Sequence, residues 1–119
     1  MTSALAEQIG KIPKLYEAGD KSTASLLKDA GFPERRRSVT VEEVEDVLKR
    51  EPDLIDLWLK RCRDQRAVGG WGIERENGVY RVMNFSDGKS LVVQGRPHAC
   101  AEFVVRYVSF IGEVLERTN

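Results

Sequence analysis

The sequence predicts an α+β fold, in which about four N-terminal helices precede a three-stranded antiparallel β-meander covered by a C-terminal amphipathic helix. Extended runs at 71–75, 79–85 and 90–94 are separated by short segments that contain glycine, which is typical of a meander. From about residue 98, apolar residues recur at helical spacing. These two patterns predict the second half of the fold, and capping residues predict the first.

Two short helices are expected at the start of the chain. Thr2 or Ser3 can cap the first, which runs through Ile9. The second is expected at 22–30, because Gly31 follows it in a position suited to the left-handed cap conformation.

The third and fourth helices have clear starts. Thr40 and Glu43 form a capping box, with Val39 and Val44 in the hydrophobic-staple positions. Pro52 suits the first turn of the fourth helix. The residues expected to face the core from these two helices are Val41, Val44, Val47, Leu48, Leu54, Ile55, Trp58, Leu59 and Cys62.

Glycine-containing turns define the meander. Asn77-Gly78 is a strong hairpin signal, because both residues tolerate positive φ. A second turn is expected at Asp87-Gly88, and Gly95 ends the third run. The last helix should present one apolar stripe, made of Cys100, Phe103, Val104, Tyr107, Val108, Ile111, Val114 and Leu115, with Trp58 and Trp71 joining the core from elsewhere.

Length and composition predict one ordinary globular domain. The chain has 119 residues, of which 41% are apolar and 32% charged, and we expect a single domain with a helical part at 1–68 and the meander and covering helix at 69–119. Nineteen basic residues balance nineteen acidic ones, so no net field attracts nucleic acid. The chain shows neither a signal-peptide pattern nor a membrane-span pattern, and its two cysteines fit a reducing compartment, so a cytoplasmic location is expected.

His98 and Cys100 are the first candidate for chemistry, because a thiol near a helix N-terminus has a lowered pKa and could pair with a histidine. Residues two apart on a helix point in different directions, however, and Cys100 falls on the apolar stripe. We therefore favour a packing or capping role for both residues.

No metal ion or other cofactor is predicted. Two cysteines in separate helices and one histidine lack the spacing of a tetrahedral metal site. The acidic residues from Glu42 to Asp56 could resemble a cluster, but we interpret them as a solvated face paired with nearby bases, including Glu45 with Lys49 and Asp46 with Arg50.

Three adjacent arginines, Arg35, Arg36 and Arg37, form a basic loop that could steer a binding partner or hold phosphate. A nucleic-acid reader would need a wider basic face with aromatic platforms. We favour an intramolecular role opposite the acidic helix that follows the loop, and we disfavour nucleic acid.

A second set of candidate binding residues surrounds the joint between the fourth helix and the sheet. Asp64, Arg66 and Trp71 bracket this joint, and Arg81 could lie across the hairpin from them. A tryptophan beside arginines has the composition of a binding hot spot. It is equally the composition of a core anchor with a cation on its ring, which we favour here.

The segment from Glu51-Pro-Asp-Leu-Ile-Asp-Leu-Trp-Leu through Asp64-Gln-Arg to Gly70-Trp71, with the hairpin and helix that follow, resembles small bacterial α+β proteins. Some proteins of that kind act as immunity or accessory proteins, so the resemblance implies action by binding.

Two functional hypotheses follow. The first is a non-enzymatic protein-binding or accessory (immunity-like) module that holds another protein or a second copy of itself. The alternative is a small enzyme or small-molecule-binding protein, with a pocket between sheet and helices that uses Tyr80, Arg81, His98 and Cys100.

Overall fold

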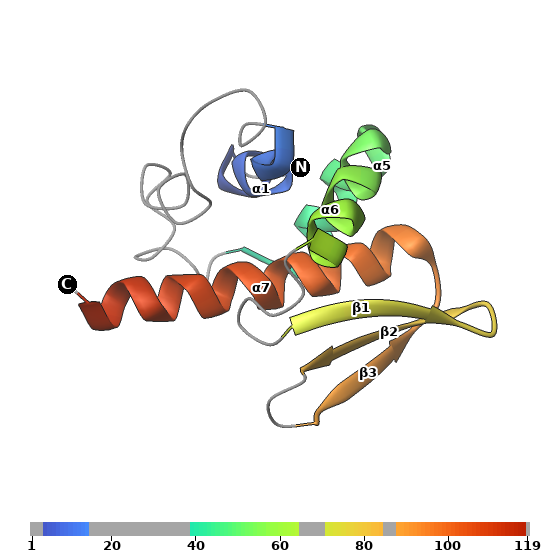
Figure 1. Cartoon of the computed structure of the whole chain (residues 1–119). Helices are drawn as coiled ribbons and strands as arrows, with labels where there is room; N and C mark the ends of the chain where they lie inside the picture. Colours follow the sequence, from blue (N-terminus) through green and yellow to red (C-terminus); the bar gives the residue numbers. More distant parts are fainter. Residues whose placement is uncertain (1–3, 15–38, 65–70, 85–87, 119) are drawn as a thin grey trace.

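The α+β class is confirmed by the computed structural model, which describes residues 4–14, 39–64, 71–84 and 88–118 (Figure 1). The helix expected at 22–30 lies outside these residues. The described elements, in chain order, are helices α1 (Ala4–Gly10), α5 (Val41–Arg50) and α6 (Asp53–Asp64), strands β1 (Trp71–Glu76), β2 (Val79–Asn84) and β3 (Ser90–Val93), and helix α7 (Arg96–Thr118).

The sheet is the expected antiparallel meander, in the order β1-β2-β3. Asn77 and Gly78 both have positive φ, at 52° and 81°, as a tight hairpin turn requires. Ile73, Val82 and Leu91 lie opposite one another across the three strands. They therefore share the face on which α7 packs.

Helix α7 begins at Arg96, two residues earlier than expected. Gly95 has a φ of 91° and its carbonyl accepts the first helical hydrogen bond, from the Ala99 N–H at 3.0 Å. Pro97 then falls in the first turn, where a missing backbone N–H has no consequence. Arg96 and Pro97, which precede the expected start at about residue 98, therefore belong to the helix.

The capping box of α5 is confirmed. The Thr40 hydroxyl accepts a hydrogen bond from the Glu43 N–H at 3.2 Å, and the Glu43 carboxylate accepts one from the Thr40 N–H at 3.4 Å. Val39 and Val44, at the staple positions, are both buried.

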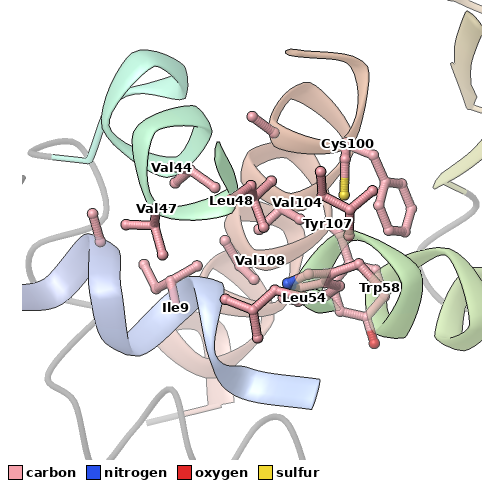
Figure 2. Close-up of a cluster of buried hydrophobic side chains, with 14 of the residues drawn as sticks. Ile9, Val44, Val47, Leu48, Leu54, Trp58, Cys100, Val104, Tyr107 and Val108 are labelled. Atoms are coloured by element: carbon pink, nitrogen blue, oxygen red, sulfur yellow. The ribbon is translucent and has the colours of Figure 1, made fainter. Parts of the chain in front are cut away.

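Trp58 lies at the centre of the core (Figure 2). Its ring meets Phe103 edge-on at 6.3 Å and Tyr107 edge-on at 6.0 Å. Its indole N–H donates a hydrogen bond to the buried carbonyl of Gly10 at 2.9 Å. Helices α1, α6 and α7 therefore meet at one side chain.

From Trp58 the core extends along both sides of α7. Helix α7 packs on α5 and α6 along one side, and on β1 and β2 along the other. The expected stripe of α7 is buried from Cys100 to Val108, and Ile111 is partly buried. The buried residues contributed by the other elements are Leu5, Ala6, Ile9, Ile12, Val39, Val44, Val47, Leu48, Leu54, Ile55, Trp58, Val82 and Val93.

Replacing Phe103 by alanine should lower the free energy of unfolding by about 3–5 kcal/mol, because its ring is 1% exposed and its removal leaves a cavity beside Trp58. Denaturant titration measures this loss. Phe110→Ala on the same helix serves as the matched control, because Phe110 is exposed and should cost far less. A loss under roughly 1 kcal/mol for Phe103→Ala would contradict the packing described here.

Candidate functional site

The contact between α5 and α7 carries a row of charged side chains on its outer side. Lys49 and Glu45 come from one face of α5, four residues apart. His98, Glu102 and Arg106 follow one another at intervals of four residues along α7. This spacing places three polar side chains on one face of the helix, next to Glu45. We call these five residues the α5–α7 charge row.

Glu45 is the link between the two helices. Its Oε1 lies 2.6 Å from Nδ1 of His98, and its Oε2 lies 2.9 Å from Nζ of Lys49. On the far side of the imidazole, Nε2 of His98 lies 4.0 Å from Oε1 of Glu102. Glu102 in turn accepts a hydrogen bond from Nε of Arg106 at 3.2 Å.

The two carboxylates are the sheltered members of the row. The side chains of Glu45 and Glu102 are 17% and 16% exposed, and the basic side chains beside them are much more open. The hydrogen bond from His98 lowers the pKa of Glu45, although burial acts in the opposite direction and Lys49 adds to the lowering. The same contact with Glu45 raises the pKa of Lys49.

Arg106 connects this row to the sheet. Its guanidinium lies over the ring of Trp71 at 5.3 Å from the centroid, a cation–π contact. Trp71 is partly buried and packs against the core, as expected of an anchor with a cation on its ring. The cation comes from α7, a source that the sequence did not indicate.

A groove opens beside Trp71 and Arg106. It has a volume of about 620 Å³ and is open to solvent. Its apolar lining includes Trp71, Val105 and Phe110, and charged residues of both signs surround them, among them Glu102 and Lys89. We call this feature the Trp71–Phe110 groove. Phe110 is 38% exposed and so presents apolar surface to solvent.

A smaller cleft of about 240 Å³ lies near the start of α7. Tyr80, Arg75 and Arg96 contribute polar groups to it. The guanidinium of Arg96 donates a hydrogen bond to the carboxylate of Asp56, and this contact raises the pKa of Arg96. The cleft therefore contains two arginines, one of which already faces an acid.

The four residues of the enzyme hypothesis lie in separate surroundings. Tyr80 lines the smaller cleft, whereas Arg81, the next residue of β2, is exposed on the opposite face of the sheet, across from Glu74. Cys100 is fully buried in the core. His98 is bonded to Glu45 in the charge row and lines neither of the two cavities.

The remaining candidate binding residues are distributed differently. Arg35, Arg36, Arg37 and Arg66 lie outside the described residues. Asp64 is the last residue of α6, and its side chain is not among those described.

Some acidic residues between Glu42 and Asp56 pair with bases that are farther away in the chain than expected. Glu45 does pair with Lys49, but Glu51 pairs with Lys11 and Lys14, which follow α1. Within the described ranges, no group of three or more histidine, cysteine, aspartate or glutamate side chains could hold a metal ion.

Sequence reasoning missed Glu102, Arg106 and Phe110. The first two form an acid-before-base pair four residues apart, so a charge-pattern search could have found them. The bond between His98 and Glu45 spans 53 positions and leaves no local signal.

No protein-family model, curated protein or solved structure matches this chain. None of the helices in the described part is both long and apolar enough to cross a membrane.

Replacing Glu45 by glutamine should reduce the acid sensitivity of the fold. A carboxylate whose pKa is lower in the folded than in the unfolded state stabilises the fold above its unfolded pKa, and this contribution disappears as the pH falls through the folded pKa. The wild type should therefore lose more unfolding free energy between pH 6 and pH 3 than Glu45→Gln does, by denaturant titration at each pH.

Glu42→Gln is the matched control, because Glu42 lies on the same helix and is exposed. It should retain the wild-type loss. Equal pH dependence in the wild type and Glu45→Gln would show that the contact with His98 does not stabilise the folded state.

Proposed function

We propose that this protein is a non-enzymatic protein-binding module that holds its partner at the Trp71–Phe110 groove. The observation that carries the proposal is the exposure of Phe110 beside the ring of Trp71 and the guanidinium of Arg106. Tryptophan, arginine and other large side chains supply most of the energy in protein interfaces, provided that the partner excludes water from them.

The form of the groove supports a protein partner over a small molecule. It is open to solvent, whereas small-molecule sites enclose most of the ligand surface. Its lining combines apolar residues such as Trp71 and Phe110 with charged residues of both signs, among them Glu102 and Arg106. Protein interfaces likewise combine large apolar side chains with polar and charged ones.

The charge row would serve this function by holding the binding side chains in place. Glu102 fixes Arg106 through two contacts, at 3.2 Å from Nε and 3.2 Å from Nη2. A guanidinium held in this way over Trp71 loses little further freedom on binding. An accessory or immunity protein would act in this manner, by binding alone.

Phe110→Gln should abolish capture of the partner without unfolding the chain, because the substitution removes apolar contact area from an exposed helical position. The immobilised protein and its variants are used to capture proteins from the lysate of the source cells, and bound proteins are quantified by mass spectrometry. Gln8→Lys, an exposed change on α1, is the control. Recovery of the same proteins by wild type and Phe110→Gln would reject the groove as the binding site.

A ligand-binding function is the second candidate, and the cleft at Tyr80 supports it, because Arg75 and Arg96 provide donors for a small carboxylate or phosphate. Titration of the isotopically labelled protein with inorganic phosphate, followed by NMR, should then shift the amides of these three residues selectively. Arg75→Gln should remove the response, and Arg81→Gln, on the opposite face, should preserve it. Uniform shifts, or none, would exclude this candidate.

A further inference from the structure

Strand β3 forms one edge of the sheet. It pairs with β2 along one side, and no described residue pairs with its other side. Helix α7 covers the sheet mainly over β1 and β2. Figure 1 shows β3 on the side of the sheet farthest from α7. Among the residues that the structure describes, nothing therefore pairs with the outer edge of this strand.

The side chains of β3 are unusually apolar for an open edge. Val92 is 58% exposed and Leu91 is 37% exposed, although they point to opposite faces of the sheet. Native edge strands are commonly protected by charged residues or proline. The segment 90–95 (Ser-Leu-Val-Val-Gln-Gly) contains neither. It lacks the usual protection against pairing with another strand.

The backbone of β3 is also oriented for such pairing. The Asn84 N–H donates a hydrogen bond to the Lys89 carbonyl at 2.8 Å, so Lys89 is bonded towards β2. Along an antiparallel strand, the backbone N–H and C=O groups of successive residues point alternately towards one neighbouring strand and away from it. Leu91 and Val93 therefore also bond towards β2, and the N–H and C=O groups of Val92 point outward.

We propose that β3 pairs with β3 of a second copy of this chain, in antiparallel register around a two-fold axis at Val92. In this register Val92 opposes its own counterpart, and the two residues exchange both backbone hydrogen bonds. Leu91 lies opposite Val93 of the second copy on the face that carries α7. Two three-stranded sheets then become one sheet of six strands.

Self-complementarity favours a second copy over a foreign strand. The two-fold axis brings valine against valine and leucine against valine, and no two charged residues oppose each other within the paired segment 90–94, because that segment is uncharged. The chain has a formal net charge of zero, so two copies do not repel each other at long range.

The covering helices do not obstruct this arrangement. A two-fold axis perpendicular to the sheet keeps both copies of α7 on the same face, each mainly over its own β1 and β2. The two copies of β3 therefore lie between them. Because four residues per strand bury little surface, we expect a weak dimer, with a dissociation constant on the order of micromolar to millimolar.

Sedimentation equilibrium over a range of concentrations tests the dimer. The wild type should approach twice the chain mass of 13.5 kDa as its concentration rises. Val92→Lys places two like charges on the axis and should remain a monomer throughout. Gln8→Lys, which makes the same change of charge on exposed α1, should behave as the wild type. A wild type that stays monomeric up to about 1 mM would overturn the proposal.

Disulfide trapping tests the register. In the proposed pair, the Cα atoms of residue 92 are roughly 5.5 Å apart, which a disulfide can span. Val92→Cys should therefore form a covalent dimer under mild oxidation. Ser90→Cys should not, because Ser90 opposes Gln94 and its counterpart is about 13 Å away along the strand. Equal trapping of both variants, or trapping of neither, would reject this register.

Phe110→Gln separates this proposal from the groove function. The groove does not include Val92, so this variant should dimerise as the wild type does, even though it loses the other partner. Loss of dimerisation in Phe110→Gln would contradict pairing through β3.

Discussion

The placement of Trp58 is the constraint on which the other contacts depend. Its indole has an apolar body that packs edge-on against Phe103 and Tyr107, and a polar N–H that needs an acceptor when buried. The Gly10 carbonyl at the end of α1 supplies that acceptor. Because the acceptor must lie at one end of the ring, α1 is fixed relative to α6 and α7. The same packing brings α5 against α7, and so places Glu45 beside His98.

The elements that the sequence predicts well are those with local causes. A capping box, an Asn-Gly turn and a helical stripe each act within a few residues, so α5, the β1–β2 hairpin and α7 were expected and are present. The candidate site depends on pairs that are distant in the chain. Arg50, expected to pair with Asp46 on its own helix, donates to Glu7 of α1 at 2.9 Å, 43 positions away. The spacing of charged residues along one helix does not show whether a base pairs with an acid of its own helix or with an acid of another helix.

Charged and apolar side chains are combined differently at α7 and at the edge strand β3. At α7, charged residues hold one another in a row and surround a groove. At β3, an uncharged segment leaves apolar side chains open. Under the two proposals above, a chain with no net charge offers one surface to a foreign partner and another to its own copy, because selectivity depends on where the charges lie and not on their total.

Two contacts restrict the residue at position 10. Its carbonyl accepts the Trp58 hydrogen bond, and a Cβ atom at this position would lie 2.8 Å from Cγ1 of Val47. Close packing against Val47 and hydrogen bonding to Trp58 therefore both act on residue 10. A side chain at residue 10 would require Val47 to move, so this helix of seven residues packs closely on α5 through the glycine at its end. Any homologue that retains Trp58 and Val47 should also retain a glycine there.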